Sequence, residues 1–326
     1  MHATASQPHP AILPPDALGG PVLVASDGAE AISEALYRAG RRAAAAYGGV
    51  IEVLGVVEPL PGVSAGTEVV PVSADLDAAR MRSLREDLQR TVSVAAAGDP
   101  AWPIDIRLGS PPRMLAREAL RRGASLLVMG IGRHNPLDRL FGAETTLATL
   151  RETSVPVLAV GSNFPAIPQQ AVVGLDFSGA SLQAAQLALR LLGPGGHLVL
   201  VHVRPRFEEP SPDWQAWDAD YSRTLPPLLA RVRAELEVPD GLTVETVVVR
   251  GDPAPTLLSY AQQVGADLIA VGTQRHAFVE RLLVGSVATR VLRHARCGVL
   301  AVPVRAADAG TGTSPRGREP WASTSP

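Results

Sequence analysis

Lysine is missing from the sequence, and every basic residue other than histidine is an arginine. A Walker A loop needs a lysine that contacts the phosphates, so this class of nucleotide site is excluded. Enzymes that form a lysine Schiff base, those that use pyridoxal phosphate among them, are excluded for the same reason. An arginine-rich genome composition explains the absence better than selection against lysine does.

Cysteine, aromatic residues and net charge are also scarce. The single cysteine, Cys297, rules out intrachain disulfides and zinc sites built from cysteines. Aromatic residues make up 4%, too few for base-stacking platforms, and a net charge of −2 gives no general attraction to nucleic acid or membranes. No apolar run reaches the ~18 residues of a membrane span, and residues 1–20 lack the pattern of a signal peptide. We therefore expect a cytoplasmic protein whose partners include neither nucleic acid nor a membrane.

The chain repeats itself over most of its length. Residues 108–129 resemble residues 250–271, with Gly109 opposite Gly251 at an offset of 142 residues. A repeat of this length indicates a domain duplication, because solenoid repeats span roughly 20–50 residues. The length of 326 residues also suits about two domains. The same offset relates Gly130 to Gly272, Arg133 to Arg275, His134 to His276, Arg139 to Arg281 and Val160 to Val302.

Strands and helices alternate in each half. Continuous apolar runs such as residues 22–26 predict buried parallel strands, and helical spacing of apolar residues predicts a helix over 29–48. The fold class is therefore α/β: two repeated doubly wound units, each a five-stranded parallel sheet with helices on both faces. The predicted strands are 22–26, 50–59, 104–109, 124–130, 155–161, 171–176, 197–205, 243–251, 266–272 and 298–304; the predicted helices include 74–98, 110–123, 179–192, 225–238, 253–264 and 286–296, and 60–74 is predicted to be a loop.

Composition sets the expected boundaries. The ends of the chain are rich in proline, glycine, serine and alanine, which predicts a flexible start and a disordered tail. The predicted segments are a flexible N-terminus at 1–20, a first domain at 21–161, a linker at 162–170, a second domain at 171–304 and a disordered tail at 305–326.

One stretch of the second unit has the form of a phosphate-binding site. Gly272 ends a strand, a loop follows, and Gly285 and Ser286 open a helix. Glycine lets the backbone approach a ligand closely. The free N–H groups at the start of a helix lie at the positive end of its dipole, where they favour an anion. This arrangement can hold a phosphate without a lysine.

With these residues, the sequence resembles the universal stress protein family, over residues 21–161 and again over 171–304. The nucleotide pattern of that family is G-x2-G-x9-G-[ST], and Gly272, Arg275 and Gly285–Ser286 keep its spacing. The resemblance implies that Asp176 faces a ribose and that the backbone at His202–Val203 contacts an adenine. It implies ATP as the cofactor, with Mg²⁺ as an optional companion and no protein metal site. The cofactor-binding residues would be Asp176, Val203, Val271, Gly272, Arg275, Gly285, Ser286 and Val287.

The two units depart from this pattern to different degrees. Arg275 stands where ATP-binding members have the second glycine; its guanidinium either clamps a phosphate or fills the phosphate space. In the first unit Arg133, Ala143 and Glu144 replace Gly, Gly and Ser, and a glutamate repels phosphate. A shifted reading, Gly132-x9-Gly142, still lacks the hydroxyl. We therefore expect the nucleotide mainly in the second unit.

The predicted function is a regulatory module that binds an adenine nucleotide. The alternative is a stress-response interaction or scaffold protein in which both clefts are degenerate and protein partners bind. No catalytic constellation is recognisable, and slow ATP hydrolysis is a third option. By resemblance, the last strands of the two units would pair antiparallel, either within one chain or in a homodimer.

Several of these residues also have purely structural interpretations. Gly285–Ser286 can be a plain helix start, and Asp176 can cap the helix that begins near residue 179. Cys297 is expected to be an inert thiol in the core. Trp214 and Trp217 lie in an acidic segment, 208–222, that we expect to be a loop. The two side chains either cover the nucleotide cleft, form an interface or are isolated exposed aromatics.

Overall fold

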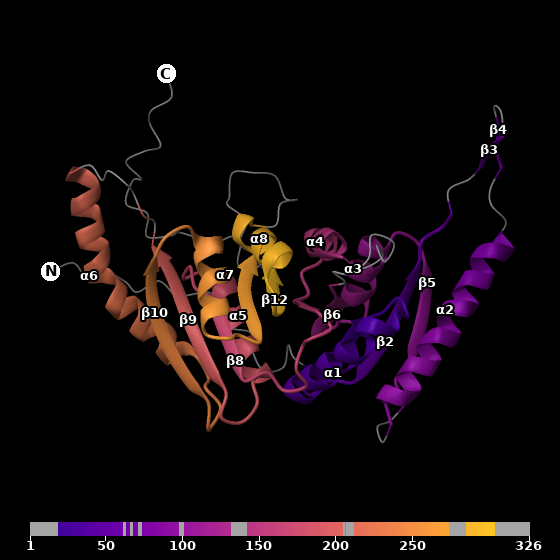
Figure 1. Ribbon diagram of the computed structural model, residues 1–326, viewed down its shortest axis with the longest axis horizontal. Coiled ribbons are helices and arrows are strands. Elements are labelled where there is room, and N and C mark those ends of the chain that lie inside the picture. The colour runs from indigo at the N-terminus through magenta and orange to yellow at the C-terminus, as the bar shows by residue number, and fades with distance from the viewer. Residues whose placement is uncertain are drawn as a thin grey trace.

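One mixed sheet of ten strands forms the centre of the molecule (Figure 1). The computed structural model describes residues 19–60, 63–65, 68–70, 74–97, 101–131, 142–204, 206, 212–273 and 285–303. Within these residues the strands of the large sheet lie in the order β10-β9-β8-β11-β12-β7-β6-β1-β2-β5. Each half of this order is a doubly wound unit of five strands, as the sequence predicts.

The first unit occupies one end of the sheet, at the right of Figure 1. Its inner strands in the large sheet are mostly apolar and buried, because helices cover both faces of the parallel sheet. Its elements are β1 (Val22–Ala25), α1 (Glu30–Tyr47), β2 (Ile51–Val57), β3 (Val63–Ala65), β4 (Glu68–Val70), α2 (Ala74–Ala95), β5 (Ile104–Leu108), α3 (Pro111–Arg121), β6 (Leu126–Gly130), α4 (Ala143–Glu152) and β7 (Val157–Val160).

In its described residues the second unit repeats this order, without a counterpart of the hairpin. Three helices, α3, α6 and α7, begin with proline, at a position where the missing N–H costs least. The elements of the second unit are β8 (Gln170–Gly174), α5 (Gly179–Leu191), β9 (His197–Arg204), α6 (Pro212–Glu235), β10 (Thr243–Arg250), α7 (Pro253–Gln263), β11 (Leu268–Thr273), α8 (Ser286–His294) and β12 (Gly298–Pro303).

The last strands of the two units join them into one sheet. β7 and β12 pair antiparallel, with Leu158 opposite Leu300 and Ala159 opposite Val299. Leu158 and Leu300 are equivalent positions at the offset of 142, so the junction has an approximate two-fold axis between them. The expected antiparallel contact between the units is therefore present, and it forms within the chain.

The helices form one layer on each face of the sheet. Side chains of α1, α2, α5 and α6 pack into one hydrophobic cluster, and side chains of α3, α4, α7 and α8 pack into the other. Contacts also cross the junction within each layer. On one face Arg42 donates from Nε to the carbonyl of Leu191 at 2.8 Å, and the Tyr47 hydroxyl donates to that of Leu187 at 3.1 Å. On the other face Arg293 of α8 bonds Glu144 of α4 at 2.9 Å.

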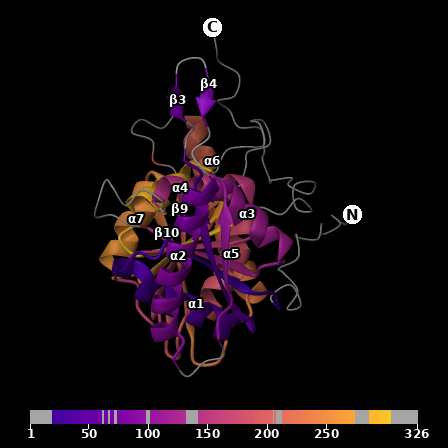
Figure 2. The ribbon, with the colours of Figure 1, turned by 90° about the vertical axis from the view of Figure 1, so that its right-hand side faces the viewer.

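Two predictions about local structure were wrong. Within the predicted loop 60–74, β3 and β4 form an antiparallel hairpin that projects beyond the body of the unit (Figure 2). The long helix begins at Pro212 rather than near residue 225, so most of the supposed acidic loop is helical. Pro226 and Pro227 lie inside this helix, where proline is normally unfavourable. The part of α6 that precedes these prolines is held in place by tertiary contacts of Asp218 and Tyr221, which are described below.

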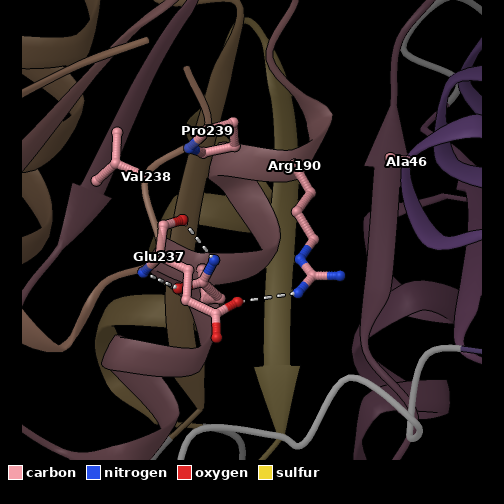
Figure 3. A pocket seen from close by; sticks show the side chains of 6 residues that line it. Ala46, Arg190, Glu237, Val238 and Pro239 are labelled. Atoms are coloured by element: carbon pink, nitrogen blue, oxygen red, sulfur yellow. Dashed lines mark hydrogen bonds and ion pairs between the residues drawn. The ribbon is translucent and has the colours of Figure 1, made fainter.

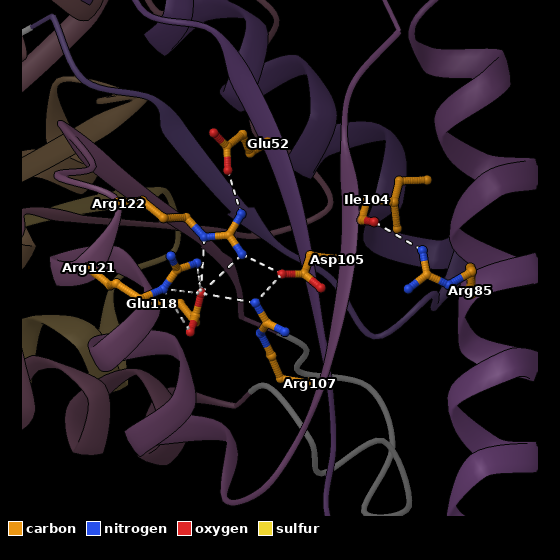
Figure 4. A network of polar contacts seen from close by, with 8 residues as sticks. All are labelled: Glu52, Arg85, Ile104, Asp105, Arg107, Glu118, Arg121 and Arg122. Carbon is orange, nitrogen blue, oxygen red and sulfur yellow. Dashed lines mark hydrogen bonds and ion pairs between the residues drawn. The ribbon is translucent and has the colours of Figure 1, made fainter.

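A network of charged groups lies where α3 meets β2 and β5 (Figure 4). Glu118 is buried, and its carboxylate accepts hydrogen bonds from Arg121 at 2.7 Å and Arg122 at 3.0 Å. Arg122 also bonds Glu52 and Asp105. The hydrogen bonds from Arg121, with those from Arg122, lower the pKa of Glu118 to about 2.

We expect Glu118→Gln to lower the free energy of unfolding by about 2 kcal/mol at pH 7, because it removes the negative charge that pairs with Arg121 and Arg122. Because the folded-state pKa of Glu118 lies below its ordinary value of 4.5, the stabilisation is complete above pH 4.5 and is lost as the pH falls toward 2. Urea unfolding of both proteins between pH 7 and pH 3 should show the difference shrinking. The control Glu34→Gln, at an exposed pair with Arg38, should change little at any pH.

Candidate functional site

The strand order reverses direction between β8 and β11, and this point is where open α/β sheets bind ligands. At the carboxyl edge there, residues 175–178 follow β8 and Thr273 ends β11. The helix α8 begins near the same edge, at Ser286, with Gly285 as its N-cap residue. The loop that joins β11 to α8 lies outside the described residues, and Arg275 is part of it.

Asp176 is exposed in the turn that follows β8. Its Oδ1 accepts hydrogen bonds from the backbone N–H of Ser178 at 3.0 Å and from the Ser178 hydroxyl at 2.5 Å. Ser178 is the residue that caps α5, through a bond from the N–H of Ser181 at 3.2 Å. In the first unit Asp27 accepts in the same way from the N–H of Ala29 at 3.0 Å. The aspartate therefore stabilises the same turn in both units, whatever else it contacts.

Gly272 has a structural reason to be glycine. A Cβ at this position would lie 2.8 Å from the backbone nitrogen of Ser181 and 2.9 Å from the backbone carbon of Ala180. The start of α5 thus packs directly on β11, and no side chain fits between them. Val271, the residue before it, is buried on the face covered by α7 and α8.

The first turn of α8 offers backbone donors to the same edge. Gly285 is the N-cap residue and, as a glycine, provides no side chain to cap the helix. Ser286 occupies the first helical position and is exposed. Among the described residues the N–H groups of this turn have no acceptor, which leaves them to solvent or to a ligand. Val287 is half-buried and packs against the core beneath.

The equivalent helix of the first unit has a different environment. Gly142 is the N-cap residue of α4, and Ala143 and Glu144 follow it. The Glu144 carboxylate is paired with Arg293 of α8, across the junction between the units. Glu144, which the sequence predicts to repel a phosphate, is thus also part of the contact between the two units. Gly132 and Arg133 lie outside the described residues.

His202 makes contacts that the sequence reasoning missed. Its Nδ1 lies 2.8 Å from the Leu175 carbonyl and its Nε2 lies 3.0 Å from the Tyr221 hydroxyl. A carbonyl can only accept, so Nδ1 carries the proton and Nε2 accepts from the tyrosine. The ring packs on Phe177, and burial lowers the pKa of His202. The signal in the sequence was a histidine within the apolar strand HLVLVHVR.

These contacts hold α6 over the ends of β9 and β10. Asp218 pairs with Arg204 and, at 2.8 Å, with Arg250. The Arg204 guanidinium lies over the ring of Tyr221, 5.6 Å from its centre. Val203 points to the opposite face, where it is half-buried against the other core cluster. Trp214, which the sequence placed in a loop, lies on α6.

Two cavities lie at the amino edge of the strands of the second unit, opposite the edge described above. One, of about 320 Å³, is lined by Arg190, Glu237 and neighbouring residues from α1, α5 and the segment after α6 (Figure 3). The Arg190 guanidinium lies 3.4 Å from the Glu237 carboxylate there. The other, of about 590 Å³, is bordered by Phe164 and Cys297, and Cys297 is only partly buried.

A family comparison decides the class of the protein. The sequence model described as the universal stress protein family matches residues 20–161 and again residues 169–303. The chain belongs to the universal stress protein family. It contains two such units in tandem, as the motifs predict.

Individual relatives are similar over parts of the chain. A universal stress protein of Methanocaldococcus jannaschii is 42% identical over 62 residues, which are 19% of this chain and 36% of the relative. The chain thus matches little more than a third of that relative's length. The crystal structure of a universal stress protein from Archaeoglobus fulgidus covers 88% of this chain and 98% of its own, with a TM-score of 0.56 and 17% identity, which shows the shared fold. A universal stress protein solved in complex with cAMP is 25% identical and covers 41% of this chain and 97% of its own, with a TM-score of 0.32.

The described residues include neither a membrane-spanning helix nor a cluster of metal ligands. None of the helices in the described ranges combines the length and the apolar character that a membrane span requires. Within the same ranges, His, Cys, Asp and Glu side chains do not gather in groups of three or more that suit a metal ion.

The two equivalent glycines provide a matched test of the packing at the site. We expect Gly272→Ala to lower the free energy of unfolding by about 1–3 kcal/mol, because backbone atoms of α5 stand in the way. Gly130→Ala in the first unit should cost less. There a Cβ meets only the ends of the Ile32 and Leu36 side chains, at 2.9 and 3.0 Å, and these can rotate. Urea unfolding of the two variants measures both values, and equal losses would contradict the close approach of α5 to β11.

Proposed function

We propose that this universal stress protein is a regulatory module that binds ATP, or a related adenine nucleotide, in its second unit. The observation that carries the proposal is the arrangement at the carboxyl edge of β8 and β11. There the Asp176 turn, the close contact at Gly272 and the uncapped first turn of α8 border the switch point of the sheet. Anions bind well at such a helix start.

Each residue has a role in this proposal. The N–H groups and the hydroxyl at Ser286 receive the phosphates, the Asp176 carboxylate faces the ribose, and the backbone at Val203 contacts the adenine. Arg275 clamps the phosphates with its planar fork of donors. Val271, Gly272, Gly285 and Val287 shape the backbone around the ligand. When Mg²⁺ accompanies the nucleotide, it neutralises part of the phosphate charge.

The chemistry of the donors fits an anionic ligand. The exposed Ser286 hydroxyl and the uncapped N–H groups are neutral donors, and the chain adds arginine rather than lysine as the cation. The first unit fits less well, because Glu144 brings a carboxylate to the equivalent helix start. We therefore propose one nucleotide per chain. The first unit would instead contribute to the contact between the two units.

The alternative is a scaffold that binds protein partners and no nucleotide. It is favoured by the structural roles of two motif residues, since Asp176 stabilises a turn and Gly272 accommodates α5. Both roles would keep these residues in place without a ligand. Ser286 has no such capping role, so it discriminates between the two proposals.

Ser286→Asp should abolish ATP binding, because it places a carboxylate among the donors that receive the phosphates. The same charge is favourable to the helix start by about 0.3–1 kcal/mol, so stability should hold. Titration calorimetry should show one site per wild-type chain and none in the variant. Ser286→Ala, the matched control, removes only the hydroxyl and should weaken binding by less than tenfold. Two equivalent sites, or full affinity in Ser286→Asp, would exclude the proposed site.

Arg275→Gly restores the residue that the family pattern has at this position. If Arg275 clamps the phosphates, the variant should bind ATP roughly tenfold or more weakly, because a charge-assisted hydrogen bond contributes about 1.5–3 kcal/mol. Binding of adenosine, which has no phosphate, should change little. If the variant instead binds ATP more tightly, Arg275 blocks the phosphate space, and the scaffold function is favoured for the wild-type chain.

A further inference from the structure

The junction between the units relates each contact to a reciprocal one. β7 and β12 pair about an approximate two-fold axis between Leu158 and Leu300. In an interface of this kind, a contact from residue i to residue j implies a second contact from the equivalent of j to the equivalent of i. The ion pair between Arg293 and Glu144 is one such contact.

The position that is equivalent to this ion pair across the axis holds two residues that cannot form an ion pair with each other. At the offset of 142, Arg293 is equivalent to Arg151 at the end of α4, and Glu144 is equivalent to Ser286 at the start of α8. The axis therefore brings Arg151 of the first unit toward the first turn of α8. Since residue 286 is serine, the carboxylate that would pair with this arginine is missing.

The state of Arg151 agrees with this placement. Its Nε is buried and has no hydrogen-bond partner, whereas the Nε of Arg293 donates to Glu144 at 2.9 Å. Arg38, Arg107 and Arg204 also have a buried Nε without a partner, but each forms an ion pair through its terminal nitrogens. In the described part of the chain no ion pair or hydrogen bond of the Arg151 side chain is present. A buried donor without an acceptor is unfavourable, and an anion would satisfy it.

We propose that Arg151 of the first unit completes the nucleotide site of the second unit. Its guanidinium takes an anionic oxygen of the ligand at the start of α8, at the place that the Glu144 carboxylate occupies in the other half. We assign this oxygen to the terminal phosphate, because that is the part of ATP farthest from the adenosine. This inference rests on the proposed function, and it gives the first unit a direct part in binding.

The first test needs no nucleotide. Ser286→Glu supplies the missing carboxylate, and we expect it to couple to Arg151. A double-mutant cycle of Ser286→Glu with Arg151→Gln, followed by urea unfolding, should give an interaction of the same sign and similar size as the cycle of Glu144→Ser with Arg293→Gln. Absence of coupling in the first cycle, with coupling in the second, would overturn the reciprocal geometry.

The second test measures affinity by titration calorimetry. Arg151→Gln should weaken ATP binding about tenfold or more. It should weaken ADP binding less, and it should leave adenosine binding within about twofold. Arg293→Gln is the matched control: it removes the equivalent arginine from α8 and should leave ATP affinity within about twofold.

The outcomes separate this inference from the proposed function. If wild-type protein binds ATP and Arg151→Gln binds it equally well, Arg151 has no part in the site and the inference is wrong. If Arg151→Gln weakens ATP, ADP and adenosine equally, the residue acts on the fold and not on the terminal phosphate, which also overturns it. If wild-type protein binds no ATP, the proposed function and the role of Arg151 fail together, and the double-mutant cycle still decides whether Arg151 faces Ser286.

Discussion

The antiparallel pairing of β7 with β12 is the constraint on which the rest of the structure depends. Both strands are buried and apolar, so each unit alone would present an exposed hydrophobic edge. Joining the edges satisfies their backbone groups and continues the sheet through ten strands. It also places α1 against α5 and α4 against α8. The contacts of Arg42, Tyr47 and Arg293 across the junction follow from this placement.

The two units keep the same backbone while their side chains differ. Phe177 and Gly28 follow the equivalent aspartates, and both have a positive φ, 62° and 80°. The strand registers make His202 equivalent to Gly55. In the first unit a Cβ at Gly55 would lie 2.7 Å from Ile106 and 2.9 Å from Leu84, so α2 packs directly on the strand. The second unit fills the corresponding space with the rings of Phe177, His202 and Tyr221. A left-handed conformation is costly for phenylalanine, and the packing of its ring on His202 helps to hold it.

The sequence predicted the elements whose signals are local. Apolar runs such as VLVA and alternation with helices were enough for the strands, their approximate bounds and the doubly wound order. The start of α6 was missed because its first half depends on distant partners, namely Arg204 and Arg250 for Asp218, and His202 for Tyr221. The motif residues were found by spacing. Spacing could not show that Gly272 accommodates α5 or that Glu144 pairs with Arg293, because both facts depend on how elements far apart in the chain pack. Whether Arg275 clamps the phosphates or fills their space stays a prediction.

Because the junction forms within one chain, its occupancy does not depend on how much protein the cell makes. Two separate subunits joined through the same strands would come apart on dilution, whereas tethered units meet at an effective concentration that the linker sets. The tandem also lets the two sides of the junction accept different substitutions. In a homodimer a change such as glutamate at position 144 would appear on both sides of the axis. Here it appears once, and the opposite side retains a serine.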